Sequence, residues 1–314
     1  MGRKRTHSEI ISQAYWGGTF WKKLLPKPHF KNFSDTPFPK GVIAVFYRDG
    51  LLDKSSHLDE ADLYHGFSTR AGGVSTLSHT SAMNVAEGHG DPHEVVRENI
   101  RILARAVSGD TLDETAVVCA PQIHSAIIRS VTEADRGTGV ILPHGGEGDG
   151  FITDTPGVLL MIRVADCVPI LYSARRADGS PIVCATHAGW RGTVAGIAAE
   201  AIRRITDMGG ELPSVRCAIG QAIHACCYEV GEDFCDAVAS ARGSEFARDH
   251  IEHRAGKLYA DVVKMNRTIL LSAGLTEEQI DISPACTACD PKRYHSHRAS
   301  RGMRGAMGAL IGIR

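Results

Sequence analysis

The stretch VLLMIRVADCVPILYSARRADGSPIVCATHAGWRGTVAGI, residues 158–197, decides the fold class. Its apolar runs at 158–164, 168–172 and 182–186 have the length and composition of buried strands. No helical pattern separates these runs, and a helix is predicted only after them, at 193–207, where a Gly-Gly pair ends it. Strands that follow one another without intervening helices favour a mixed sheet over a doubly wound parallel sheet.

The same reasoning extends outward to the rest of the chain. Further strands are predicted at 42–46, 64–68, 116–119, 126–131, 215–219, 280–283 and 306–313, and further helices at 91–107, 231–240 and 259–273. The first of these helices opens on Asp91-Pro92-His93-Glu94, in which Asp91 and Glu94 predict a capping box. We therefore expect an α/β (α+β) fold, a single domain with mixed β-sheets flanked by helices.

Residues 1–40 differ in composition from the remainder. They hold two of the three tryptophans, several lysines and four prolines, which predicts an N-terminal extension that packs on the surface or stays partly mobile. No linker-like segment divides residues 41–314, which are therefore predicted to form one domain.

Composition and charge exclude several classes of protein. The chain has 314 residues, with 35 Lys+Arg against 36 Asp+Glu and a formal net charge of −1, so it lacks the basic excess of a dedicated nucleic-acid binder. It has no run of about 18 apolar residues and no secretory signal, so we expect no membrane span. Nine scattered cysteines, an odd number, indicate a reducing, cytoplasmic location. The expected partners are small molecules, and the oligomeric state stays open.

Three short segments place a candidate metal ligand at a strand end. They are Gln122-Ile123-His124, Ala165-Asp166-Cys167 and His187-Ala188-Gly189-Trp190-Arg191-Gly192. Two histidines and one cysteine are zinc ligands, and three protein ligands leave a fourth position open, as in catalytic zinc sites. Taken singly, each of His124, Cys167 and His187 is better interpreted as a buried cysteine or a hydrogen-bonded core histidine than as a metal ligand.

Two glycine-rich loops carry an arginine that could bind an anion. Arg191 precedes the predicted helix at 193–207, and Arg70 lies in the loop TRAGGVS at 69–75. A guanidinium next to free backbone N–H groups suits a phosphate. The alternatives are a glycine turn with Trp190 as a core anchor and an ordinary hairpin turn.

The remaining cysteine and histidine motifs predict structural roles. Cys226-Cys227 and Cys286-x-x-Cys289 do not have the spacing of two CxxC pairs, so we expect no structural zinc site there. Prolines flank the second pair closely, which disfavours the helix of a redox CxxC motif. His295 and His297 would point to opposite faces of an extended segment and so would not share one metal.

Together these motifs resemble those of the laccase-domain proteins, also called the multicopper polyphenol oxidase or purine nucleoside phosphorylase family. The ADC segment combined with HAGWRG is highly specific, and the similarity extends from about residue 41 to the C-terminus. The matching stretches are HGFSTRAGGVS (65–75), MNVAEGHGDPHEVVRENI (83–100), QIH (122–124), GDGFITDTPGVLLMIRVADCVPILY (148–172), HAGWRGTVAGI (187–197), AIG (218–220), CCYEVG (226–231), YADVVKMNR (259–267) and CTAC (286–289).

The resemblance implies a single α/β domain with a metal bound by the histidine of QIH, the cysteine of ADC and the histidine of HAGWRG. Carried over, the ligands are His124, Cys167 and His187, with zinc as the expected metal and copper as the alternative. These three residues and Asp166 would be the catalytic residues. The expected substrate or phosphate ligands are Arg70, Arg191, Asn84, Ser296 and Arg298.

Two segments depart from the family pattern. The family's tail has an aromatic pair followed by Ser-Tyr-Arg-Arg-Asp, whereas this chain has Tyr294-His295-Ser296-His297-Arg298-Ala299. The loop IGQAIHACCYEVG has Gln221 where the family has Pro and His224 where it has Gly. These changes leave the predicted metal ligands intact and bear on substrate preference.

The activity implied by the family is phosphorolysis of purine nucleosides to a free base and ribose 1-phosphate. Adenosine, inosine, guanosine and methylthioadenosine are all candidate substrates, and adenosine deamination is a possible second activity. In this reading the metal polarises phosphate or a ribose hydroxyl, and the two arginines neutralise phosphate charge. Asp166 and Cys167 supply negative charge beside the oxocarbenium-like sugar.

Three alternatives remain. A copper polyphenol oxidase needs many histidines around a trinuclear cluster, and His295/His297 is the sole His-x-His pair. A cysteine amidase that edits peptidoglycan precursors would use Cys167 as nucleophile and His187 as base, in competition with metal binding. A non-catalytic binding protein would not need the His/Cys/His set.

Overall fold

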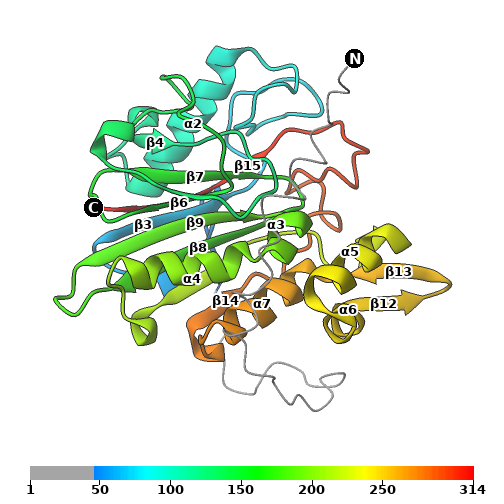
Figure 1. Cartoon of the computed structure of the whole chain (residues 1–314). Helices are drawn as coiled ribbons and strands as arrows, with labels where there is room; N and C mark the ends of the chain where they lie inside the picture. Colours follow the sequence, from blue (N-terminus) through cyan, green and yellow to red (C-terminus); the bar gives the residue numbers. More distant parts are fainter. Residues whose placement is uncertain (1–45) are drawn as a thin grey trace, which may run out of the picture. The chain divides into compact units, whose positions relative to one another are not determined.

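The computed structural model describes residues 46–314. The predicted extension at 1–40 and nearly all of the predicted strand at 42–46 lie outside the described residues. Two six-stranded sheets pack face to face, and helices cover the outer face of each (Figure 1).

The first sheet is antiparallel except at one edge. Its strand order is β1 (Phe46–Asp49), β2 (Leu52–Ser55), β3 (Leu63–Ser68), β15 (Met307–Ile313), β7 (Leu159–Val164) and β4 (Val117–Val118). Strands β4 and β7 run parallel, and the other neighbours run antiparallel. The C-terminal strand thus lies in the middle of the sheet, between strands from distant parts of the chain.

The second sheet contains the strands that were predicted at 168–172 and 182–186. Its order is β14 (Ile280–Ile282), β10 (Arg216–Ile219), β8 (Val168–Arg175), β9 (Pro181–Ala188), β6 (Gly150–Thr153) and β5 (Ile128–Ser130). The β14–β10 and β6–β5 pairs at the two edges are parallel, and the inner pairs are antiparallel. Both sheets are therefore mixed, as the sequence predicts.

Side chains that alternate between the two faces of a strand contribute to two layers of the hydrophobic core. On β7, Leu160 and Ile162 face the second sheet, whereas Leu159 and Met161 face helix α2 (His93–Ser108). Successive side chains of a strand point to opposite faces, so a fully apolar strand is buried on both sides.

Helices α4 (Ile197–Asp207) and α7 (Val262–Ser272) cover the outer face of the second sheet (Figure 1). The short helix α3 (Trp190–Ala195) lies between β9 and α4 in the chain. The remaining elements are α5 (Glu232–Arg242), α6 (Ser244–His250), the small antiparallel sheet of β11 (Glu229–Val230), β13 (Lys257–Ala260) and β12 (Ile251–Arg254), and the 3-10 turns Ser56–Leu58, Glu114–Ala116, Glu133–Asp135, Leu212–Ser214 and Glu277–Gln279.

The fold class is confirmed, with corrections in detail. The helix predicted at 193–207 is two helices, because Gly196 adopts a left-handed conformation (φ 92°) that ends α3. The predicted capping box is absent: α2 begins after Pro92, and the Asp91 carboxylate accepts hydrogen bonds from Ser75, Thr80 and Asn84 instead. Strands β2, β6, β11, β12 and β13 and helix α6 were not predicted from the sequence.

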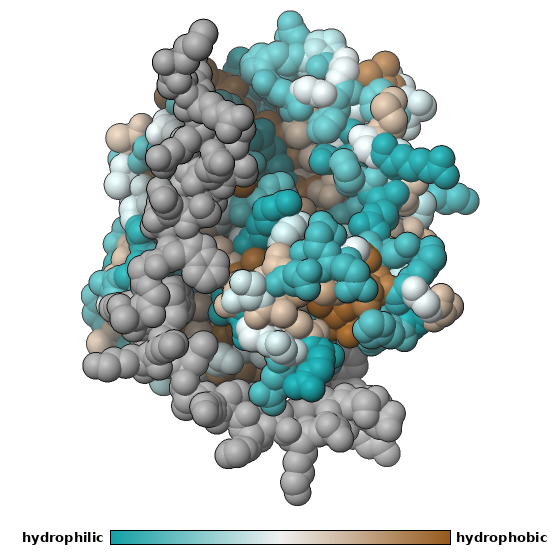
Figure 2. All heavy atoms as spheres, turned by 45° about the vertical axis from the view of Figure 1, so that its right-hand side comes forward, coloured by the Kyte–Doolittle hydropathy of each residue, from teal (hydrophilic) through white to brown (hydrophobic). Residues whose placement is uncertain are grey.

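Residues 46–314 contain no helix that is both long enough and apolar enough to span a membrane. On the face drawn in Figure 2, hydrophilic residues cover most of the visible described surface, and hydrophobic residues appear in small patches.

Candidate metal centre

The structure brings together the three residues of the predicted metal site. One ligand atom from each of His124, Cys167 and His187 lies within 4.8 Å of the others. Cys167 Sγ is 3.8 Å from His124 Nε2, and the two imidazole rings meet edge to face with centroids 4.9 Å apart. His187 is buried, Cys167 half-buried and His124 exposed, so the cluster is accessible from one side.

The sheet register explains why Cys167 and His187 meet. Strands β8 and β9 are antiparallel, with Val168 opposite Ala188, so the start of β8 adjoins the end of β9. Gly189, which follows β9, makes room for the third ligand. A Cβ atom there would lie 2.4 Å from His124 Cδ2 and 3.4 Å from Cys167 Sγ, so a side chain at this position would displace His124.

Asp149 organises the cluster from behind. Its carboxylate is fully buried and accepts a hydrogen bond from His187 Nδ1 (2.8 Å), which leaves His187 Nε2 for the cluster. The same carboxylate accepts hydrogen bonds from the backbone N–H groups of Ile123, His124 and Ser125. One side chain therefore fixes both a ligand ring and the loop of another ligand, as partners of metal-binding histidines commonly do.

The charged groups of this cluster stabilise one another's ionised forms. Burial alone would disfavour a Cys167 thiolate, but His187 and His124 lower the pKa of Cys167 to about 6. Burial also opposes charge on His187, but Cys167 and Asp149 raise the pKa of His187 to about 9. Despite burial, hydrogen bonds from His187 and Ser125 hold the pKa of Asp149 below its usual value. A metal dication would replace the His187 proton and keep the thiolate neutralised.

Two of the five non-glycine residues with positive φ in the described part of the chain lie at this cluster. His124 (φ 61°) and Asp166 (φ 85°) adopt left-handed conformations that non-glycine residues rarely take. Asp166 accepts hydrogen bonds from Thr287 Oγ1 (2.6 Å) and from the backbone N–H of Arg298 (2.7 Å). The predicted catalytic carboxylate is therefore fixed by two segments that follow β14.

The predicted anion ligands differ in their surroundings. Arg191 is exposed and stacks on Trp190, with its guanidinium carbon 4.2 Å from the ring centroid. Arg298 stacks on Tyr228 (4.9 Å) and donates to the Glu229 carbonyl. Burial raises the pKa of Tyr228 to about 12, with a further contribution from the negative Cys167, while Arg298 and Arg191 oppose this rise. Arg191 and Arg298 thus lie on the side of Tyr228 and the metal ligands.

Arg70 is engaged elsewhere. Its guanidinium donates hydrogen bonds to the backbone carbonyls of Ser81 (2.9 Å), Pro291 (2.7 Å) and Ser78 (3.3 Å). These contacts tie the glycine-rich loop to the C-terminal tail.

Asn84 and Ser296 are buried within the protein. Asn84 is fully buried, and its side-chain amide bonds to Ala86, Asp91 and the backbone N–H of Ala306. Ser296 Oγ accepts a hydrogen bond from the Ala299 N–H (3.1 Å) and shapes the turn before Arg298. The structure places both residues in the framework that supports the tail.

Asp149 and Arg304 were not among the site residues predicted from the sequence. Asp149 sits in the GDGF segment that precedes β6, and its acidic side chain between two glycines was the available signal. Arg304, in the basic tail, donates to His89 Nε2 (3.3 Å). Burial lowers the pKa of Arg304, and the negative charges of Cys167 and Asp166 oppose this shift.

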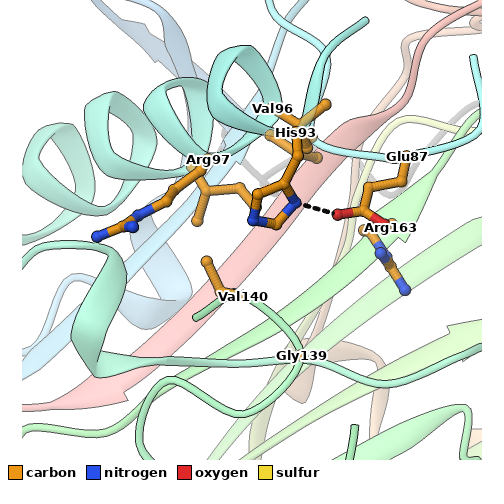
Figure 3. A pocket seen from close by; sticks show the side chains of 9 residues that line it. Glu87, His93, Val96, Arg97, Gly139, Val140 and Arg163 are labelled. Carbon is orange, nitrogen blue, oxygen red and sulfur yellow. Dashed lines mark hydrogen bonds and ion pairs between the residues drawn. The ribbon is translucent and has the colours of Figure 1, made fainter. Parts of the chain in front are cut away.

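A separate cavity lies against α2 and is far smaller than a nucleoside. His93, Arg97, Gly139 and Arg163 are among its lining residues, and His93 Nδ1 lies 2.5 Å from Glu87 Oε1 (Figure 3). Its volume of about 10 Å³ is at the limit for a single water molecule. None of the three metal-ligand candidates lines it.

The donor set of the cluster fits a divalent metal. Two imidazoles and one thiolate, converging with a hydrogen-bonded carboxylate behind one ring, are typical of a metal site with one open coordination position.

Several known proteins are similar to this chain over most of its length. Purine nucleoside phosphorylase YlmD from Geobacillus stearothermophilus is 36% identical over 255 residues, covering 79% of this chain and 89% of that protein. Adenosine deaminase RL5 from an unknown prokaryotic organism is 29% identical over 252 residues, covering 79% of this chain and 93% of that protein. The crystal structure of the hypothetical protein YfiH from Bacillus licheniformis matches with a TM-score of 0.77 at 30% identity, covering 86% of this chain and 99% of that chain.

The family model described as multi-copper polyphenol oxidoreductase laccase matches residues 64–314. That range contains all three metal-ligand candidates and Asp149, and it begins within β3. The chain belongs to this laccase-domain family.

Proposed function

We propose that the chain is a metal-dependent purine nucleoside phosphorylase that cleaves adenosine with phosphate to adenine and ribose 1-phosphate. The observation that carries the proposal is the convergence of His124, Cys167 and His187 beside exposed arginine. Relatives that bear the name purine nucleoside phosphorylase support this substrate class. Inosine, guanosine and methylthioadenosine are the alternative substrates. The nine unpaired cysteines support a cytoplasmic location.

His124 Nε2, Cys167 Sγ and His187 Nε2 would hold the metal, for which zinc suits the donor set and copper is the alternative. When bound, the metal would supply Lewis acidity toward an oxygen of phosphate or ribose. Asp149 keeps His187 Nδ1 protonated and so directs Nε2 to the cluster.

Phosphate carries two negative charges that need positive partners. The Arg191 side chain is exposed and makes no ion pair with the described residues, and Arg298 keeps donors beyond the one that bonds to Glu229. A planar guanidinium binds phosphate through two parallel hydrogen bonds. These two arginines would hold phosphate next to the metal ligands, and Arg70 would assist only if its bonds to three carbonyls were exchanged.

In phosphorolysis the bond from C1′ of ribose to the purine nitrogen breaks, and a phosphate oxygen forms the new bond to C1′. The sugar then passes through an oxocarbenium-like state, and the purine leaves with the electron pair and gains a proton. Asp166 would stabilise the positive sugar, since a carboxylate has capacity for contacts beyond the two hydrogen bonds it accepts.

One observation favours a second candidate, a cysteine amidase acting on peptidoglycan precursors. In the metal-free protein, Cys167, His187 and Asp149 form a row in which His187 raises the thiolate fraction of Cys167 and Asp149 orients His187. This is the arrangement of a cysteine nucleophile with its base and orienting carboxylate. The amidase requires Cys167 free of metal, whereas the phosphorylase requires the metal.

Two other activities have less support. Adenosine deamination at the same site is supported by the relative named adenosine deaminase RL5. A polyphenol oxidase would need a copper cluster rich in histidine. Within residues 46–314 the groups suited to a metal are this triad, with two histidines, and a group of four cysteines.

The test is a panel of purine nucleosides and a peptidoglycan amide, incubated with and without phosphate on protein of measured metal content. Adenine and ribose 1-phosphate formed only with phosphate and metal would support the proposal. Inosine alone would favour the deaminase, and amide hydrolysis that persists after chelation would favour the amidase.

A further inference from the structure

Four cysteines that lie outside the His/Cys/His site converge on one point. Cys226 and Cys227 lie between β10 and β11, and Cys286 and Cys289 follow β14. All four Sγ atoms lie within 4.8 Å of one another. We call this group the tetracysteine cluster.

The sulfur separations suit a shared metal. Cys289 Sγ lies 3.5 Å from Cys226 Sγ and 3.3 Å from Cys227 Sγ. Tetrahedral zinc with four thiolates at about 2.3 Å places its sulfurs about 3.8 Å apart. A disulfide would require about 2.05 Å, and all nine cysteines of the chain are unpaired. The expectation that these cysteines cannot form a zinc site was based on sequence spacing, and the fold supplies the second pair from a different segment.

The backbone holds the two ligand segments together independently of any metal. Ala222 and Cys286 form a parallel β-bridge, and the Thr287 N–H donates to the Ala222 carbonyl (2.9 Å). The His224 N–H points at Cys286 Sγ at 3.5 Å, a contact that stabilises a thiolate. Cys226 and Cys289 are exposed, so an ion can reach the cluster from solvent.

We propose that Cys226, Cys227, Cys286 and Cys289 bind a zinc ion as a second, structural site, separate from the candidate active site. Four thiolates complete the coordination of zinc and leave no position for substrate, which distinguishes a structural site from a catalytic one. Soft thiolate ligands select zinc over the hard cations Mg²⁺ and Ca²⁺.

The zinc would hold in place the two loops that donate hydrogen bonds to Asp166. Thr287, which lies inside the Cys286–Cys289 segment, donates its hydroxyl to Asp166 Oδ1 (2.6 Å), and Asp166 adjoins Cys167 in sequence. The Ile223 N–H, close to Cys226, donates to the Asp166 carbonyl (2.9 Å). The site would therefore hold two loops against Asp166, the residue with positive φ next to Cys167, without contacting substrate.

Zinc content of the full chain tests the proposal. The protein is chelated under reducing conditions, reloaded with zinc sulfate, desalted and analysed for zinc per chain. Cys289→Ser should contain one equivalent less than the unaltered protein, and Cys235→Ser, which changes a half-buried cysteine of α5 outside the cluster, should lose none. Equal zinc in the unaltered and Cys289→Ser proteins would overturn the proposal.

The test depends on the difference in zinc content between the unaltered and Cys289→Ser proteins, and not on the total zinc of either one. If His124, Cys167 and His187 bind no metal, the totals become one and zero, and the structural site still stands while the proposed function fails.

A second measurement, which does not use Cys289→Ser, covers the case in which that variant does not fold. Cobalt(II) replaces zinc in the Cys167→Ala protein, which keeps the tetracysteine cluster as its sole cysteine-based site among the described residues. Intense sulfur-to-cobalt charge-transfer absorption is expected and would be abolished by Cys226→Ser. Absence of that absorption in the Cys167→Ala protein, or a count of seven rather than nine thiols in the denatured, unreduced protein that keeps all its cysteines, would refute the site.

Discussion

The His124/Cys167/His187 site and the tetracysteine cluster are both built from cysteine and histidine, yet they differ in ligand number and surroundings. The first has three candidate ligands, a buried carboxylate that accepts a hydrogen bond from one of them, and Arg191 in the segment that follows His187. The second has four candidate ligands and no acidic partner among the hydrogen bonds of its sulfurs. An incomplete ligand set next to charged side chains suits substrate chemistry, and a complete set suits the fixing of loops.

The two sites also differ in what their neighbours do. Asp149 directs His187 and the loop of His124, so the first site is organised by side-chain charge. The tetracysteine cluster is organised by backbone contacts between two segments, such as the bridge of Ala222 with Cys286. Mutations should therefore affect catalysis at the first site and local stability at the second.

The largest expected effect on activity comes from replacing Cys167, the one sulfur ligand of the first site. Cys167→Ala should lower kcat/KM for phosphorolysis by more than about 100-fold and remove the metal of the first site, because one of three ligands is lost. Activity and metal per chain are measured together. Cys235→Ala, on α5, serves as the control and should change neither. Full metal content with full activity in Cys167→Ala would contradict the assignment of the ligands.

Asp149→Asn tests whether the first site depends on side-chain charge. The amide cannot hold His187 in the same tautomer with the same strength, so metal affinity should fall by about 10- to 100-fold. The zinc of the tetracysteine cluster should be retained. Competition with a chelator measures both. The matched change Asp154→Asn, at the other end of β6, removes a carboxylate that pairs with Arg176 and should leave the affinity unchanged. An unaltered affinity in Asp149→Asn would show that the carboxylate does not tune the site.

Arg191 and Arg70 allow a comparison of two predicted phosphate ligands. Arg191→Ala should raise the KM for phosphate about tenfold with little change in the KM for nucleoside, because it removes one charged donor. Arg70→Ala should mainly lower the free energy of unfolding, by about 1–3 kcal/mol, because three backbone carbonyls lose their donor. Phosphate titrations and urea unfolding separate the two outcomes. A phosphate effect confined to Arg70→Ala would reverse these roles.

The smallest expected effect is a pH dependence of thiol labelling in the metal-free protein. His187 and His124 lower the pKa of Cys167 to about 6 in spite of burial, so the thiolate is formed above that pH and lost below it. Iodoacetamide labelling of Cys167 should stay near its plateau from pH 8 to 7 and fall to about half at pH 6. Burial and the neighbouring Cys289 raise the pKa of Cys227 to about 11, so Cys227 should label slowly across this range. Peptide mapping by mass spectrometry gives both rates, and a Cys167 rate that climbs only above pH 8 would exclude the thiolate.

Sequence patterns predicted much of the framework because local chemistry determines it. The apolar runs within β7, β8 and β9 do not alternate between apolar and polar residues, which predicts strands that are buried on both faces. The motifs around His124, Cys167 and His187 identified the family, and they predicted three metal ligands whose side chains converge in the structure. The glycine at 189 had a reason that only the structure shows, since His124 occupies the space of its missing side chain.

The tertiary structure decided which distant residues became neighbours. Cys226-Cys227 and Cys286-x-x-Cys289 do not match a linear zinc motif, and β10 and β14 must pair in parallel before their following loops meet. The role of Asp149 likewise depends on the antiparallel register of β6 with β9, which sets it against His187. The glycine-rich loop around Arg70 led to the prediction that Arg70 binds phosphate. In the fold, its guanidinium donates hydrogen bonds to three backbone carbonyls. Periodicity and turn residues fix elements and their faces, whereas register and loop packing, which sum many weak long-range contacts, fix the partners of each polar side chain.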